Sequence, residues 1–163
     1  MIEIHPLARV SRLADIEDSL RGTRFVVGAH SMIDSFVKFK PAGGRGDVVI
    51  GDHVAINAGC VVYSGHGIRI GNHVAIAANC TLAPVNHAYA RGDRRIDEQG
   101  FLPSRGGIVV EDDVWIGANS VLLDGAVLRR GCVVGAGSLV RGEVPAYSVH
   151  AGNPLQRLGQ RHA

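Results

Sequence analysis

The chain has 163 residues, of which 46% are hydrophobic and 20% are charged, and its formal net charge is +2. This composition excludes a disordered chain, and so small a net charge gives no support for nucleic-acid binding. No apolar run approaches the ~20 residues of a membrane span, and residues 1–4 lack the basic start of a secretory signal. Three cysteines without a CxxC pair predict neither a disulfide framework nor a zinc ribbon. We therefore expect one cytoplasmic domain over residues 1–163, with no membrane insertion.

A six-residue repeat runs along most of the chain. Its clearest stretch is led by Ile50, Ile56 and Val62. The same frame places an aliphatic residue or Phe at positions 4, 10, 16, 27, 33, 39, 70, 76, 82, 110, 116, 122, 128, 134 and 140. These positions form six groups of three hexads, and any extra residues between groups follow the third hexad. So long and constant a period predicts a stacked repeat architecture.

The repeat predicts an all-β chain that forms a parallel β-helix of about six triangular coils. A helical period of 3.6 and an alternating strand do not explain it, and a repetitive β-sandwich does not explain insertions at a single corner. Each hexad is expected to give a short strand and a turn, with its lead residue inward. Coils stacked at the ~4.8 Å strand spacing would then align Val10, Ile33, Ile56, Ile76, Ile116 and Val134. The period does not give the handedness, and parallel crossovers are ordinarily right-handed.

One long insertion and one terminal segment interrupt the repeat. The insertion, residues 83–107, carries four arginines and three carboxylates at positions 91, 93, 94, 95, 97, 98 and 105. This mixture fits either a solvated loop or a loop that receives an anionic acceptor such as a nucleotide sugar. After Val144 the hexads stop, and residues 145–163 are expected to cap the coil. Asn153 as N-cap and Pro154 at the first helical position predict a short C-terminal helix.

Four segments carry a resemblance to a known family. They are Asn86-His87 at the start of the insertion, Asp113-Val114-Trp115-Ile116-Gly117-Ala118 after it, Gly135-Ala136-Gly137-Ser138, and Ala151-Gly152-Asn153-Pro154. With the hexads, they resemble the hexapeptide-repeat acyltransferases with a left-handed β-helix. The similarity is greatest to the galactoside, maltose and xenobiotic O-acetyltransferase branch and to related cell-envelope sugar acetyltransferases. It implies a homotrimer, acetyl-CoA as donor, and active sites between neighbouring subunits.

His87 is the candidate catalytic residue. Acyl transfer to a hydroxyl needs a base that works near neutral pH, for which His is the natural side chain. A loop anchored at its base can position such a ring, and His87 stands near the start of the insertion. The resemblance implies the same role, because the family's catalytic His aligns with His87. The alternative is a solvated loop histidine.

The resemblance also implies residues that contact the acceptor. Asn57 aligns with an acceptor contact of the family, although a polar corner side chain is the alternative. Glu98 lies in a Glu-Gln-Gly segment that recurs in the sugar branch, and Asn86 belongs to the motif of His87. Where the family often has an acidic residue this chain has Gly65. His66 therefore either replaces the missing polar contact or caps a two-residue insertion.

A further set of residues is implied for binding CoA. The family places the equivalent of Trp115 beside the pantetheine arm, although packing at a trimer seam is the alternative. Small side chains let an extended arm approach the backbone. Basic residues that relatives carry near the C-terminus are missing here, and Arg157 is the nearby substitute. The expected CoA contacts are Trp115, Gly117, Ala118, Ala136, Arg141, Gly142 and Arg157.

Two rows of side chains of metal-binding type are not expected to hold an ion. The fourth place of successive first hexads holds His30, His53, His73 and Asp113. This row is expected to face outward, and ligands stacked along a flat face rarely converge on one ion. Cys60 and Cys80 are expected to stack inside the coil as free thiols. No metal site is expected.

The sequence leaves the function among four hypotheses. The first is an acetyl-CoA-dependent O-acetyltransferase that acts on a sugar or a cell-envelope polysaccharide precursor, with His87 as general base and direct transfer. The second is an N-acetyltransferase for a nucleotide-linked amino sugar, which would share the site. A zinc lyase of the γ carbonic anhydrase type lacks the expected His-x4-His pair after His87. A non-catalytic scaffold does not explain the long loop.

Overall fold

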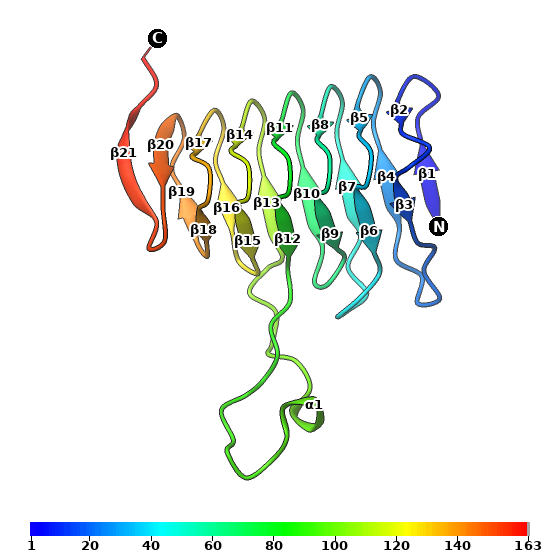
Figure 1. Ribbon diagram of the computed structural model, residues 1–163, viewed down its shortest axis with the longest axis vertical. Helices are drawn as coiled ribbons and strands as arrows, with labels where there is room; N and C mark the ends of the chain where they lie inside the picture. Colours follow the sequence, from blue (N-terminus) through cyan, green and yellow to red (C-terminus); the bar gives the residue numbers. More distant parts are fainter. Residues whose placement is uncertain (163) are drawn as a thin grey trace.

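The computed structural model describes residues 1–162 and forms a column of stacked triangular coils, as the repeat predicts (Figure 1). Each coil gives one short strand to each of three sheets, named A, B and C here. Six full coils are followed by part of a seventh. All neighbouring strands are parallel except β20 and β21. Within the described chain no helix is long and apolar enough to cross a bilayer.

The strands fall into the three sheets in chain order. Sheet A contains β1 (Ile2–Ile4), β4 (Phe25–Val27), β7 (Val48–Ile50), β10 (Ile68–Ile70), β13 (Ile108–Val110), β16 (Val127–Leu128) and β19 (Glu143–Val144). Sheet B contains β2 (Arg9–Val10), β5 (Met32–Ile33), β8 (Ala55–Ile56), β11 (Ala75–Ile76), β14 (Trp115–Ile116), β17 (Val133–Val134), β20 (Ser148–Ala151) and β21 (Gln156–Gln160). Sheet C contains β3 (Asp15–Ile16), β6 (Lys38–Lys40), β9 (Val61–Tyr63), β12 (Thr81–Ala83), β15 (Val121–Leu123) and β18 (Leu139–Val140).

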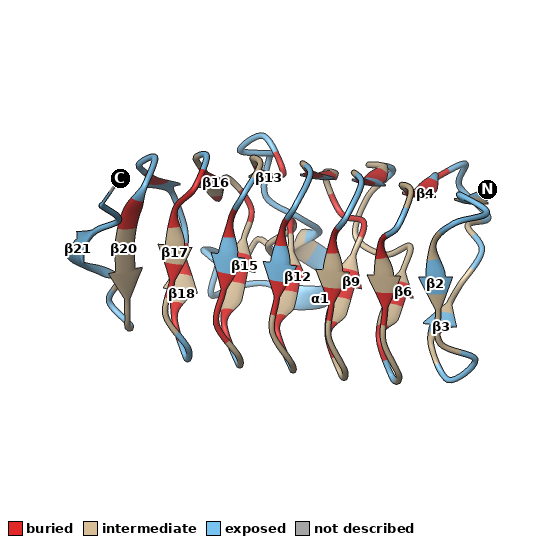
Figure 2. Ribbon diagram, turned by 90° about the horizontal axis from the view of Figure 1, so that it is seen from above, coloured by how far each residue is buried: buried red, intermediate tan, exposed pale blue. Residues whose placement is uncertain are grey.

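The predicted column of lead residues is confirmed in its register. Val10 pairs with Ile33, which pairs with Ile56, and the series continues through Ile76, Ile116 and Val134. From Ile33 onward these side chains are at most 1% exposed. Aliphatic side chains stacked in this way hold the coils together by hydrophobic burial (Figure 2).

The insertions all leave the column at the corner where sheet C leads into sheet A, as expected. The longest runs from β12 to β13 and holds the one helix of the described residues, α1 (Ile96–Gln99). Backbone packs on backbone at this corner. A Cβ atom at Gly46 would lie 2.0 Å from the amide nitrogen of Gly67, so Gly46 has no room for a side chain.

The predicted C-terminal helix is wrong. After a turn at residues 152–155 the chain forms β21, which pairs antiparallel with β20, so that Ala151 lies opposite Gln156. A helix would have left the outer edge of β20 unpaired. Pairing along that edge satisfies its backbone groups and outweighs the local signals of Asn153 and Pro154. The last part of the cap is therefore a hairpin.

Candidate active site

The long loop has a paired neck that carries His87. The amide of Ala88 donates to the carbonyl of Gly100 at 3.0 Å, and the amide of Leu102 donates to the carbonyl of Asn86 at 2.8 Å. His87 and Phe101 face each other between these two bonds as an antiparallel bridge. The neck fixes the start and the end of the loop side by side, while the tip extends away from the column (Figure 1).

The base of the loop is anchored by Asp124, which no sequence motif singled out. Its buried carboxylate accepts hydrogen bonds from the amides of Arg105 and Gly107, both at 2.8 Å. On the entering strand of the loop, the amide of His66 donates to the carbonyl of Pro84 at 2.9 Å. Because both strands are tied to the coils, the neck has a defined position. In the sequence, the Asp124-Gly125 pair indicates a turn, but nothing there indicates that Asp124 bonds to the loop.

The ring of His87 is exposed and lies against the ring of Phe101. The two centroids are 4.6 Å apart, and the planes are tilted by 47°. This contact orients the imidazole while its edge stays open to solvent. A ring held in this way can accept a proton from a group that approaches the neck. Asn86, directly before it, is half-buried.

Most charges of the loop tip pair with one another. Arg91 pairs with Asp93, and Arg95 pairs with both Asp97 and Glu98. The Gln99 amide group donates to the carbonyls of residues 91, 94 and 95, so it closes the tip as a compact turn. Glu98, expected near the acceptor, is therefore placed as an ion-pair partner within the loop.

Asn57 lies far along the chain from His87, at the corner where sheet B leads into sheet C. Its Nδ2 donates to the carbonyl of Ile76 at 2.7 Å, so its amide joins two coils. Asn57 and His87 occupy different corners, and one chain alone does not bring them together. This hydrogen bond from the Asn57 side chain supports the alternative that Asn57 is a polar corner residue.

The expected CoA residues divide between two corners and the terminal hairpin. Trp115, Gly117, Ala118 and Ala136 gather where sheet B leads into sheet C, and Trp115 is 55% exposed. A Cβ at Gly117 would lie 2.4 Å from the Ala136 nitrogen, so this corner is tightly stacked. Arg141 and Gly142 lie at the next corner, where sheet C leads into sheet A. They line the rim of a hollow of about 330 Å³. Arg157 lies on β21, where it donates to Gln160.

A second hollow of about 330 Å³ lies beside His66, on the outer side of sheet A at the loop base. Asp47, Arg69 and Gly106 also line it. The Nε2 atom of His66 is buried and, among the described residues, has no hydrogen-bond partner. His66 is thus next to the loop base, bonded to Pro84, whereas the His87 ring contacts Phe101.

The histidine row faces outward as expected. The His30 and His53 rings stack at 4.9 Å, and the His53 and His73 rings at 4.8 Å. Across residues 1–162 no three His, Cys, Asp or Glu side chains are grouped to hold a metal ion.

The cysteines are buried free thiols, as expected. The Cys60 Sγ donates to the carbonyl of Ala77 at 3.1 Å, and the Cys80 Sγ to that of Gly117 at 3.2 Å. Burial raises the pKa of Cys132 to about 12. All three side chains are 0% exposed, so an acyl-CoA carbonyl carbon does not reach their sulfur atoms.

Two family models match the chain. The model described as "Bacterial transferase hexapeptide (six repeats)" matches residues 107–142, and "Hexapeptide repeat of succinyl-transferase" matches residues 47–84. A 2,3,4,5-tetrahydropyridine-2,6-dicarboxylate N-acetyltransferase from Staphylococcus aureus is 45% identical over 58 residues, which make up 36% of this chain. The match spans only 24% of that relative's length.

Solved structures resemble the whole column. A hexapeptide-repeat-containing acetyltransferase from Vibrio cholerae is 32% identical, with a TM-score of 0.69 over 86% of this chain and 74% of that one. A variant of AntD, an N-acyltransferase from Bacillus cereus, has a TM-score of 0.82 over 99% of this chain and 84% of its own. AntD was crystallised with dTDP-4-amino-4,6-dideoxyglucose and coenzyme A. At 21% identity, that likeness shows the fold.

Proposed function

The chain belongs to the hexapeptide-repeat acyltransferase family, with its left-handed parallel β-helix, and from that premise we propose that it transfers an acyl group from acyl-CoA to the amino group of a nucleotide-linked sugar. The observation that carries the proposal is the exposed His87 ring, held on a paired neck and oriented by Phe101. A long, anchored loop with an open imidazole is suited to proton transfer.

Two observations favour an amine over a hydroxyl group, and a third favours a nucleotide-linked acceptor. AntD, which has the same fold, was crystallised with a dTDP-linked amino sugar, and the Staphylococcus aureus relative is an N-acetyltransferase. In the described chain, Arg94 and Arg105 of the loop have no carboxylate partner, unlike Arg91 and Arg95. Free guanidinium groups suit the diphosphate of such an acceptor.

The proposed reaction is a direct transfer. The amine nitrogen attacks the thioester carbon, the new C–N bond forms, and the C–S bond breaks to release the CoA thiolate. His87 takes the proton that the amine loses and passes it to the departing sulfur, so no proton is gained or lost overall. The buried cysteines support transfer without an acyl-enzyme. The backbone amide of Ala118 is our candidate to stabilise the negative charge on the carbonyl oxygen.

We place acyl-CoA along the corner between sheets B and C. Trp115 offers an exposed ring there, and Ala136 is an exposed residue with a small side chain. An extended pantetheine arm can approach a backbone whose side chains are small. Arg141, Gly142 and Arg157 are proposed to contact the remainder of the CoA molecule, and Glu98, Asn57, His66 and Asn86 the acceptor.

We further propose a cytoplasmic homotrimer whose sites lie between copies. His87 and Asn57 occupy different corners of one chain, so a single chain does not combine them. The loop exposes Tyr89, Ile96 and Leu102, which are 71%, 56% and 41% exposed. Apolar side chains on an extended loop are stabilised when a neighbouring copy covers them.

O-acetylation is the second candidate, because the Asn86-His87 motif resembles the sugar O-acetyltransferases. One experiment separates the two. The purified protein is given acetyl-CoA with dTDP-4-amino-4,6-dideoxyglucose or with its 4-hydroxy counterpart, and free CoA thiol is measured. We expect thiol release with the amine alone. Release with the hydroxyl compound alone would transfer the assignment to O-acetylation, and no release with any acceptor in a broad sugar screen would favour a non-catalytic coil.

A further inference from the structure

Phe36 differs from the other members of a row of turn residues at the corner where sheet B leads into sheet C. One residue from each of five successive coils occupies the same place in this turn, and each has a left-handed backbone with φ between 58° and 73°. The row consists of Phe36, Gly59, Asn79, Asn119 and Gly137. Gly and Asn tolerate this conformation, whereas a bulky side chain is strained in it. In this row only Phe36 carries such a side chain.

The chain itself gives the strained ring of Phe36 little to contact, since Phe36 is 68% exposed. Tyr147 also combines a six-membered ring with a left-handed backbone, at φ 57°. Its ring fills the place of a missing side chain, because it lies 2.5 Å from where Gly131 would carry a Cβ atom. The Phe36 ring fills no such place. Strained residues cluster at sites that bind ligands, which makes Phe36 a candidate for such a role.

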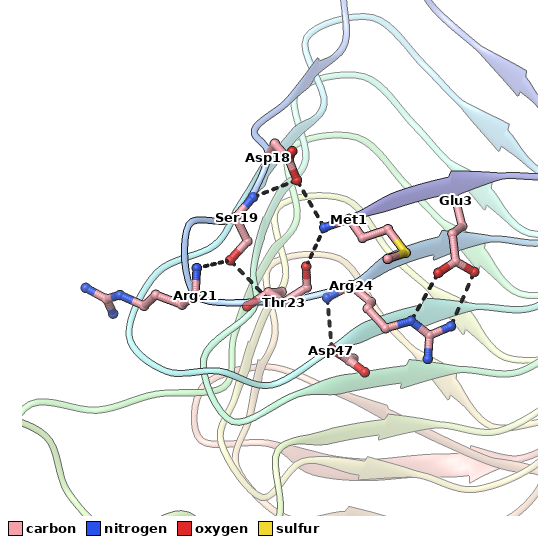
Figure 3. Close-up of polar contacts among 8 residues, drawn as sticks. All are labelled: Met1, Glu3, Asp18, Ser19, Arg21, Thr23, Arg24 and Asp47. Carbon is pink, nitrogen blue, oxygen red and sulfur yellow. Dashed lines mark hydrogen bonds and ion pairs between the residues drawn. The ribbon is translucent and has the colours of Figure 1, made fainter.

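An arginine without a partner lies beside Phe36 on the preceding coil. The carbonyl of Leu13 accepts the Phe36 amide at 3.0 Å, which places Arg12 next to the turn of Phe36. Arg12 is exposed, and in residues 1–162 its guanidinium group has no ion-pair or hydrogen-bond partner. The four acidic side chains of residues 1–20 are already paired, Asp18 with the Met1 ammonium group and Glu3 with Arg24 (Figure 3), and Asp15 and Glu17 with Lys38. Arg12 is therefore free to bind a ligand.

On the other side of Phe36 the row presents an amide group. The Asn79 side chain folds over Gly59, where a Cβ atom would lie 2.3 Å from Asn79 Oδ1. Asp34, two residues before Phe36, adds a carboxylate whose Oδ1 accepts the following amide at 2.7 Å. The turn residues around the ring are polar or small except for Leu13. Phe36 is thus an isolated ring among polar groups rather than part of a broad apolar face.

We infer that Phe36 stacks against the base of the nucleotide-linked acceptor, an inference that rests on the proposed function. The face of a nucleobase stacks on an aromatic side chain, and its edge takes hydrogen bonds from side chains around it. Arg12 can donate to the carbonyl oxygens of such a base. The amide group of Asn79 can both donate and accept.

The position of Phe36 along the column fits this role. Asn57, which we propose to contact the acceptor, lies one coil from Phe36 at the same corner. Trp115, which we propose to contact acyl-CoA, lies three coils from Phe36, roughly 14 Å at the ~4.8 Å strand spacing. The other proposed CoA contacts lie on the coil of Trp115 or beyond it. The acceptor would therefore extend from the reacting groups toward Phe36, with its diphosphate and pentose between the amino sugar and the base.

Titration calorimetry with dTDP and with CoA tests the inference without catalysis. F36N introduces the residue that the row carries at two other places, so the melting temperature should rise by about 2–4 °C as the backbone strain is relieved. Its affinity for dTDP should fall by about 5- to 150-fold, through loss of one base–aromatic stack, while its affinity for CoA should not change. F36Y keeps a ring and should keep the affinity for dTDP. The matched control is Y147N, which replaces the other left-handed ring and should also keep it.

Three results would overturn the inference. The first is equal dTDP affinity in F36N and Y147N, or no binding of dTDP at millimolar concentration by the unaltered protein. The second is a loss of CoA affinity alone, which would assign the ring to the adenine of acyl-CoA. The third is a lower native mass of F36N with unchanged dTDP affinity, which would assign it to a contact between copies. Failure of the proposed function is detected separately, because the unaltered protein would then release no thiol from acetyl-CoA with any acceptor, including amino sugars without a nucleotide.

Discussion

The imidazole of His87 and the phenyl ring of Phe101 lie 4.6 Å apart across the two strands of a loop neck. They are fourteen positions apart in the chain and meet because the neck pairs on both sides of them. Phe101 is therefore expected to position the proposed base without touching the reacting atoms.

Replacing Phe101 by Ala should free the His87 ring. We expect kcat to fall by about 10- to 100-fold, because a misplaced group loses orientation, while KM for acyl-CoA changes little. The control is Y147A, an exposed aromatic at a corner between sheets A and B, outside the loop. Steady-state kinetics on both variants test this prediction. The same kcat in both variants would show that Phe101 does not position His87.

Asp124 should hold the loop in place. D124N replaces an acceptor oxygen by a donor against two amides and should cost about 1–3 kcal/mol of folding free energy. It should also make residues 88–106 more sensitive to limited proteolysis and lower kcat. D112N is the control, since Asp112 accepts the amide of Asn72 at 2.8 Å, away from the loop. Proteolysis of the loop that is as slow in D124N as in D112N would show that the anchor is not needed.

The column was predictable from the sequence because its register repeats locally. The six-residue period alone predicted the pairing of Ile33, Ile56 and Ile76. The hairpin at β21 was not predictable, because the edge that it pairs with arises only after the coils have stacked. Local signals at Asn153 and Pro154 therefore pointed to a helix that the fold does not contain.

The site was predictable only in part, for a similar reason. Motif and chemistry singled out His87, but its contact with Phe101 depends on how the loop closes. Asp124 follows the last strand of the fifth coil and bonds to the end of the loop, a contact that no six-residue pattern describes. The hydrogen bond by which the Asn57 side chain joins two coils likewise arises only once the coils have stacked.

Ala136→Trp tests where acyl-CoA binds. Ala136 is exposed, so a large side chain should extend outward and leave the coil folded. We expect weaker binding of acyl-CoA, measured by calorimetry, with a melting temperature close to that of the unaltered protein. A146W, at an exposed corner between sheets A and B, is the control. Unchanged affinity in folded A136W would place the CoA groove elsewhere.

His150 should make the C-terminal cap sensitive to acid. Burial lowers the pKa of His150 below its ordinary value of 6.5, and the Ser148 hydroxyl lies 3.1 Å from its Nδ1. The folded state therefore binds fewer protons than the unfolded state. The contribution of His150 to the free energy of unfolding is therefore complete above about pH 6.5. It is lost as the pH falls through the lowered pKa.

Denaturation with urea at pH 7.5 and pH 5 measures this effect. The loss of unfolding free energy between the two pH values should be smaller in H150Q than in the unaltered protein. H5Q, which alters an exposed histidine, should retain the full loss. The same loss in H150Q and H5Q would rule out His150 as the source.

The most direct test of the account is steady-state kinetics of H87A with a verified acceptor. General base catalysis typically contributes about 10²–10⁴-fold, so kcat should fall by that factor. Acyl-CoA binding should stay nearly intact, because His87 is proposed to move protons and is not among the proposed CoA-binding contacts. H66A, at the loop base, should retain more activity than H87A. A kcat for H87A near that of the unaltered protein would contradict the mechanism and leave His66 as the next candidate base.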